Sequence, residues 1–148
     1  MLKSAALFIL ATIVLLAPQD SVANSEKYKA RLDAIQKTES TCMDKLGETT
    51  AGMLDCMGRS ANQLDTLLTD SYNHLRKAVR DDPVFFDALK TEQLAWIKIR
   101  KAASARSAAP YGGGTAGTLT SASVYNTILR NRIDFFIYLI QCTEPIGE

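Results

Sequence analysis

Apolar and polar positions alternate in steps of three and four along most of this chain, which is the pattern of helices that bury one face. The clearest run lies between Thr50 and Arg80. Its apolar stripe falls at Met53, Met57, Ala61, Leu64, Leu68, Tyr72, Leu75 and Val79. No alternation with a period of two extends over a useful length. The pattern therefore predicts one long helix here and no sheet.

Three further helices are predicted from the same spacing. The first runs from about Ser25 to Met43, and the last from about Ser121 to Cys142. Another follows the Asp-Asp-Pro sequence, with Asp82 as its cap and Pro83 in its first turn, and ends near Arg106. Their apolar positions are Tyr28, Leu32 and Ile35; Phe85, Phe86, Leu89, Trp96 and Ile97; and Tyr125, Ile128, Leu129, Ile133, Phe136, Leu139 and Ile140. Short connections favour an all-α antiparallel four-helix bundle, and the longest linker is the glycine-rich stretch 107–119.

The first 23 residues have the pattern of a bacterial signal peptide. Lys3 precedes an apolar run from Ala5 to Ala17, and Ser21, Val22 and Ala23 form a small-x-small site. The run is too short to cross a bilayer, so cleavage near Ala23 is favoured over an uncleaved anchor. No cysteine follows it as a lipid attachment site. We therefore expect a periplasmic or secreted domain over 24–148, with no stable membrane anchor.

The charge of the chain excludes some classes of partner. A formal net charge of +1 is too close to neutral to favour nucleic acid or an anionic surface as a partner. Between Lys98 and Arg132 there are six basic residues and no acidic residue: Lys98, Arg100, Lys101, Arg106, Arg130 and Arg132. Such a run is more often a solvated face than a docking patch.

Three cysteines in an exported protein leave one without a partner. Cys42 and Cys56 lie at similar distances on either side of a glycine-bearing turn, so they are the predicted pair. A bridge closing this loop stabilises the fold by about 3 kcal/mol in the chain-entropy model. Cys142 then stays free, pairs between chains or displaces one of the others.

Catalytic and metal-binding signatures are lacking in the sequence. His74 is the only histidine, and no carboxylate stands at a spacing that would complete a metal site with it. The Gly-Gly-Gly-Thr-Ala-Gly-Thr run has no phosphate-loop lysine and follows a helix instead of a strand. We therefore predict a protein that is not an enzyme and holds no cofactor.

Several short motifs follow one another along the chain. They are the two cysteines, an Asp-x-x-Leu-x-x-x-Tyr row, a Gln-x-x-Trp-x-x-x-Arg row, a Gly-Gly-Thr loop and a late arginine-bearing helix. Their residues are Cys42, Cys56, Asp65, Leu68, Tyr72, Gln93, Trp96, Arg100, Gly113, Gly114, Thr115 and Arg132. Taken in order, these motifs resemble the lysozyme inhibitor LprI-like family of small secreted bacterial proteins. The resemblance implies a helical inhibitor that binds a lysozyme.

The chain departs from the family pattern in three places. Ser104 and a position near Val124 stand where the family often carries a second cysteine pair, and Thr69 replaces an asparagine. The lipid-bearing cysteine of the founding inhibitor is also missing.

A strongly cationic lysozyme favours an acidic inhibitor surface, which this composition does not offer. A periplasmic structural or envelope-stress interaction protein with the same fold is therefore the alternative to a lysozyme inhibitor.

The tryptophan row and the glycine-rich loop receive separate interpretations. Gln93, Trp96 and Arg100 share one helix face. Trp96 is expected in the core, Arg100 over its ring or paired with Asp65, and Gln93 on a loop carbonyl. The loop 109–118 is either a passive linker or the partner-binding element, in which case Tyr111, Gly113, Gly114 and Thr115 would contact the lysozyme.

Overall fold

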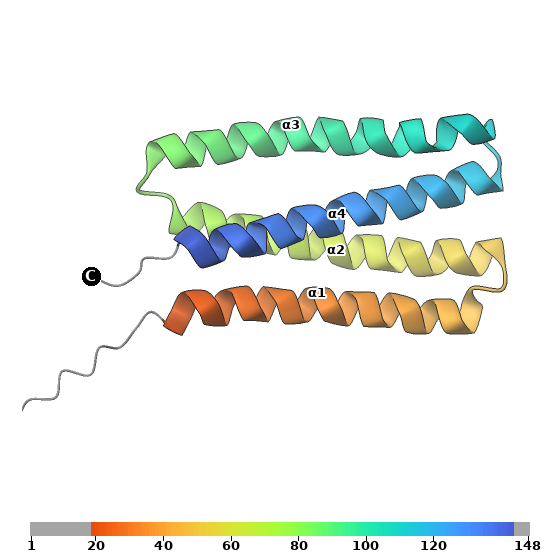
Figure 1. The fold of residues 1–148 in the computed structure, drawn as a ribbon, viewed down its shortest axis with the longest axis horizontal. Coiled ribbons are helices and arrows are strands. Elements are labelled where there is room, and N and C mark those ends of the chain that lie inside the picture. Colours follow the sequence, from red (N-terminus) through yellow and green to blue (C-terminus); the bar gives the residue numbers. More distant parts are fainter. Residues whose placement is uncertain (1–18, 144–148) are drawn as a thin grey trace, which may run out of the picture.

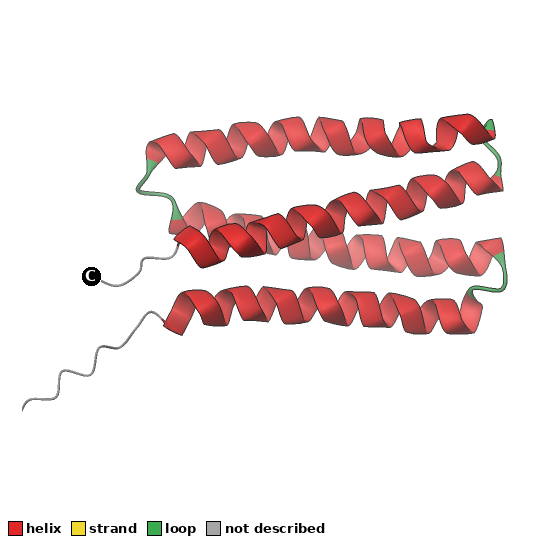
Figure 2. Cartoon of the chain, viewed as in Figure 1, coloured by secondary structure: helices red, strands yellow, loops and turns green. Residues whose placement is uncertain are grey.

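The computed structural model describes residues 19–143, and these form four long helices joined by short turns (Figures 1 and 2). Helix α1 spans Gln19–Leu46, α2 Thr50–Ala78, α3 Pro83–Ala108 and α4 Thr115–Thr143, and a 3-10 turn, η1, covers Ala109–Tyr111. No strand occurs among these residues. The predicted all-α antiparallel bundle is confirmed.

The central pair of the bundle is α2 and α4. Helix α1 packs against both of them, whereas α3 packs mainly against α4 and lies along one edge (Figure 1). The predicted stripe of α2 is confirmed, since Leu64, Leu68, Leu75 and Val79 are buried. The remaining core residues are Tyr28, Leu32, Leu67, Leu89, Leu129, Ile133, Phe136 and Ile140.

Side-chain caps fix the starts of α2 and α3. The Gly52 amide donates to Thr49 Oγ1 at 3.0 Å, and the Phe85 amide donates to Asp82 Oδ1 at 3.0 Å. These bonds satisfy amides that have no acceptor within the first helical turn. The predicted cap at Asp82, with Pro83 as the first helical residue, is confirmed.

Two predicted boundaries are wrong. Helix α1 begins at Gln19 and not near Ser25; residues 1–18 of the predicted signal peptide lie outside the described residues. Helix α4 begins at Thr115 and not near Ser121, so the expected linker 107–119 shrinks to Gly112–Gly114. Tertiary contacts of the first α4 turns, described below, outweigh the weak helix propensity of this serine- and glycine-rich sequence.

The disulfide between Cys42 and Cys56 is confirmed. It joins α1 to α2 with their Cα atoms 5.6 Å apart. Cys142, near the end of α4, is free and exposed, which corresponds to the first of its three expected states.

Candidate functional site

Two turns lie at the same end of the bundle, which we call the turn end. It contains the α1–α2 turn at residues 47–49 and the α3–α4 turn at Gly112–Gly114 (Figure 1). The disulfide lies on the same side of the molecule, within two turns of the first of these connections. The predicted partner-binding loop therefore lies at the same end of the bundle as the disulfide, which joins the other two helices, α1 and α2.

The glycine turn has a defined backbone conformation. Gly112 and Gly113 have φ angles of 60° and 84°, which favour glycine over other residues. The Gly112 amide donates to the Ala109 carbonyl at 3.3 Å, and the Gly114 amide donates to the Tyr111 carbonyl at 3.4 Å. The glycine run is thus required for a tight corner between two helices. Tyr111 precedes this corner with 52% of its surface exposed.

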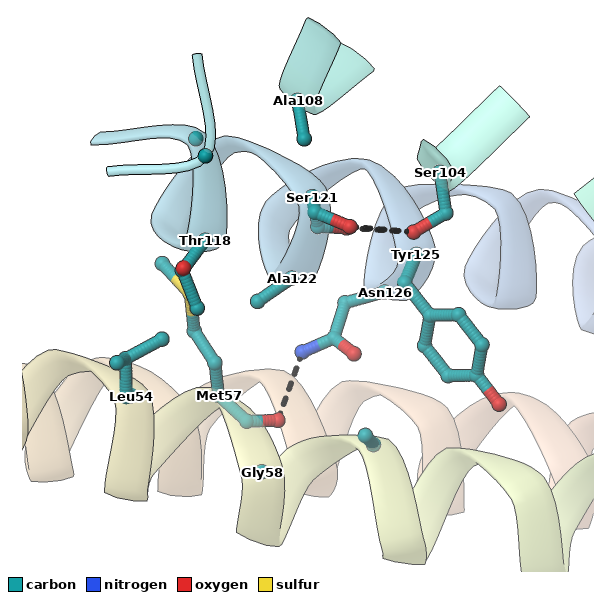
Figure 3. A pocket seen from close by; sticks show the side chains of 13 residues that line it. Leu54, Met57, Gly58, Ser104, Ala108, Thr118, Ser121, Ala122, Tyr125 and Asn126 are labelled. Carbon is teal, nitrogen blue, oxygen red and sulfur yellow. Dashed lines mark hydrogen bonds between the residues drawn. The ribbon is translucent and has the colours of Figure 1, made fainter. Parts of the chain in front are cut away.

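A cleft of about 450 Å³ lies beneath the glycine turn, between α2, α3 and α4 (Figure 3). Small residues leave this space open, including Gly58, Ala61, Ala108 and Ala122. Figure 3 shows Asn126 between α4 and α2, where its Nδ2 donates to the Met57 carbonyl at 3.0 Å. Its Oδ1 is buried and has no hydrogen-bond partner among the described residues.

The α3–α4 corner is tied by serines and by close packing. Ser104 Oγ lies 2.8 Å from Ser121 Oγ and donates to the Ser121 carbonyl at 3.1 Å. A Cβ on Gly117 would approach the Ala108 carbonyl to 3.2 Å, so a glycine allows the two helices to meet here. Ser104 therefore bonds to Ser121, one helical turn before Val124.

Asp65 is the centre of a polar cluster that joins three helices. Its Oδ1 accepts from Arg100 Nη1 at 2.8 Å, and its Oδ2 accepts from the Tyr125 hydroxyl at 2.9 Å. The Arg100 guanidinium also lies 5.0 Å from the Trp96 ring centre and 4.8 Å from that of Tyr125. Both contacts predicted for Arg100 are therefore present.

The same cluster shifts the ionisation of Tyr125. Burial raises the pKa of its hydroxyl, and donation to the Asp65 carboxylate raises it further. The nearby positive charge of Arg100 opposes this shift. Tyr125 is therefore a neutral hydrogen-bond donor in the cluster.

Arg132 forms a second polar cluster near the middle of the α3–α4 interface. This buried side chain donates from Nε to Gln93 Oε1 at 2.9 Å and from Nη1 to Glu92 Oε1 at 2.5 Å. Its guanidinium lies 4.6 Å from the ring centre of Phe136 and 5.7 Å from that of Trp96. Gln93 therefore accepts from an arginine of α4, and the predicted bond to a loop carbonyl is wrong.

Trp96 is only partly buried, which corrects the expectation that it fills the core. It packs against the edge of the core because α3 lies at the periphery of the bundle. Its ring is contacted by the guanidinium groups of Arg100 and Arg132. The signature row is confirmed as one helix face, and its polar members contact α2 and α4.

The basic run divides into paired and exposed side chains. Arg130 pairs with Glu39 of α1, which also accepts from Ser60 Oγ at 2.5 Å. Arg100 and Arg132 belong to the clusters above. Lys98, Lys101 and Arg106 are exposed on α3 and form no ion pair with the described part of the chain.

Several contact residues were not found from the sequence. Glu39, Ser60, Glu92 and Asn126 complete polar contacts between helices. Tyr125 was predicted only as an apolar position, and its hydroxyl bonds to Asp65. Such residues are hard to recognise in the sequence, because a polar residue on an apolar helix face indicates a contact only when the neighbouring helix is known. His74 is partly buried, with its ring centre 5.6 Å from that of Tyr28.

Residues 19–143 contain neither a cluster of metal-ligating side chains nor a helix that could span a membrane. Within residues 19–143, no three histidine, cysteine or carboxylate side chains gather closely enough to hold a metal ion. In that same range no helix combines the length and apolar character needed to cross a bilayer.

Comparison with known proteins connects this geometry to one family. No curated protein and no solved structure matches the chain. The family model described as lysozyme inhibitor LprI matches residues 42–136, from the first disulfide cysteine to the buried Phe136 of α4. That range includes the disulfide, the Asp65 and Arg132 clusters and the glycine turn. The chain therefore belongs to the lysozyme inhibitor LprI family.

Proposed function

We propose that this protein is an exported inhibitor that blocks a lysozyme sterically with its turn end. Family membership supports the activity. The disulfide, which persists in oxidising compartments, and the signal-like residues 1–23 support export. The observation that carries the choice of surface is the exposed Tyr111 beside a glycine turn of fixed conformation.

The turn end is suited to covering a saccharide cleft without chemistry of its own. Lysozyme cleaves with two carboxyl groups, so a blocking surface needs hydrogen-bond donors that reach them. The candidate donors are the hydroxyls of Tyr111 and Thr115, the guanidinium of Arg106 and the first amides of α4. Gly114 precedes α4 and has no side chain to accept from those amides.

The shape of the turn sets how the inhibitor would bind. Only three residues separate η1 from α4, so the turn end covers a cleft and does not thread a long loop into it. Its internal hydrogen bonds and the serine contacts already order the backbone. Binding would therefore cost little conformational entropy, which favours affinity.

Inhibition assays with the protein from residue 24 onward, against several structural classes of lysozyme, test the proposal. We expect Tyr111→Ala to weaken inhibition at least about tenfold, equivalent to about 1.4 kcal/mol. Tyr138→Ala is the matched control, because Tyr138 is 59% exposed and lies near the C-terminal end of α4, away from the glycine turn at its start. Circular dichroism should show unchanged helicity in both variants.

The outcomes separate the surface from the activity. Full inhibition by Tyr111→Ala would exclude the turn end as the binding surface. If the wild-type protein inhibits no class of lysozyme, the activity itself is excluded. A structural or envelope-stress interaction protein then becomes the better account of the fold.

A further inference from the structure

Helix α3 exposes four large aliphatic side chains to solvent. Only Leu89 and Gln93 are buried among its 26 residues, whereas α2 and α4 each bury seven. Its exposed aliphatic residues are Val84, Leu94, Ile97 and Ile99, with exposed fractions from 43% to 80%. Because α3 packs mainly against α4, one long side of this helix has no partner helix.

Five exposed residues on that side form what we call the α3 stripe: Lys90, Leu94, Ile97, Lys98 and Lys101. Leu94 lies four residues after Lys90, and Ile97, Lys98 and Lys101 lie three, four and seven residues after Leu94, so all five share one face over about 16 Å of helix. The two aliphatic residues lie between Lys90 and the other two lysines. The stripe is therefore both basic and apolar.

The positive charge of the stripe is not neutralised within the described structure. Its three lysines make no ion pair with residues 19–143. The acidic residues of α3 are Asp87, which lies one turn before Lys90 on the same face and is outnumbered by the three lysines, and Glu92, which pairs with Arg132 on another face. No acidic residue follows until Asp134.

We propose that the α3 stripe binds the surface of a membrane that contains anionic phospholipid. Lysine side chains can keep their ammonium groups at the lipid phosphates while Leu94 and Ile97 enter the apolar boundary. Lysines close to the surface of an anionic membrane are attracted to it, and apolar area that enters the interface adds to this binding. Protein interfaces are depleted in lysine and enriched in arginine and aromatic residues, so a protein partner fits this face less well. The proposal concerns a different surface from the turn end and does not depend on lysozyme inhibition.

Vesicle co-sedimentation tests the proposal. The protein is mixed with phosphatidylcholine vesicles that contain or lack phosphatidylglycerol, at low and high ionic strength. We expect binding only to the anionic vesicles, and weaker binding at high salt because the charges are screened. Lys98→Ala combined with Lys101→Ala should reduce the partition coefficient about thirtyfold, from a factor of about five for each lysine.

Lys37→Ala combined with Lys45→Ala provides a matched control. Both lysines are exposed on α1, and the net charge changes equally. Wild-type affinity in this control and a loss in the α3 variant support the stripe, and a loss in Leu94→Ser adds support for its apolar part. Equal losses in the two lysine pairs, or no binding of the wild type to anionic vesicles, would overturn the proposal. So would binding to soluble heparin without binding to vesicles, which would assign the face to a soluble polyanion.

Discussion

Replacing Arg132 by alanine tests how much the polar contacts of α3 contribute to stability. The substitution leaves Gln93 Oε1 buried without its donor, which costs about 1–3 kcal/mol. Losing the guanidinium from the rings of Phe136 and Trp96 costs about 0.5–2 kcal/mol more. The Glu92 side chain is 50% exposed, so water replaces its lost partner at little cost. The expected decrease in the free energy of unfolding is about 3 kcal/mol.

Urea denaturation followed by far-ultraviolet circular dichroism measures this loss, with the disulfide kept intact. For a domain of this size we expect the midpoint of thermal unfolding to fall by about 10 °C. Arg59→Ala is the control, because Arg59 forms an exposed ion pair with Asp55 one turn earlier on α2. That substitution should cost less than about 0.5 kcal/mol.

The comparison of the two arginines can refute the reasoning. If Arg132→Ala destabilises the protein no more than Arg59→Ala does, the buried contacts of Arg132 do not stabilise α3. Arg132→Lys adds a second measurement, since it keeps the charge but loses the planar fork that contacts both Gln93 and Glu92. We expect its stability to lie between those of the wild type and the alanine variant.

Three further predictions concern stability. Trp96→Ala should cost about 2–3 kcal/mol in urea denaturation, below the range for fully buried aromatic residues because the ring is partly exposed; a cost below 1 kcal/mol would contradict its packing role. Cys42→Ser combined with Cys56→Ser should lower the free energy of unfolding by about 3 kcal/mol, and unchanged stability would show that the bridge does not constrain the unfolded chain. The pKa of Tyr125 is raised in the folded state, so its neutral hydroxyl contributes to stability at pH values below the unfolded pKa near 10.0. This contribution to the free energy of unfolding is lost as pH rises through the folded pKa. Tyr125→Phe should therefore lose less stability than the wild type in alkaline urea titrations, and parallel losses would refute the assignment.

The helices and their caps follow from local sequence, which explains why they could be predicted. The apolar steps of three and four in α2 correspond to the buried Leu64, Leu68 and Leu75. The Asp82 cap forms with an amide three residues later, and the disulfide forms between two helices joined by a short turn. These features depend on residues close together in the chain.

The wrong predictions depend on how distant helices are placed. Trp96 was expected in the core because the sequence does not reveal that α3 lies at the edge of the bundle. The early start of α4 depends on the contact of Gly117 with the end of α3 and on the bonds between Ser104 and Ser121. Likewise, Gln93 accepts from Arg132, which lies 39 residues later. No local pattern specifies such pairs.

The polar residues of the family signature form internal contacts in this protein, and this bears on where partner specificity can reside. Asp65, Gln93, Arg100 and Arg132 all bond to other helices, so their polar groups are already used to hold the bundle together. Gly112 and Gly113 are likewise required by their backbone conformation. Tyr111 is different, because it is exposed and its hydroxyl makes no hydrogen bond with the described residues. A chain that kept the internal clusters but changed residue 111 should therefore keep the fold and bind a different partner, or none.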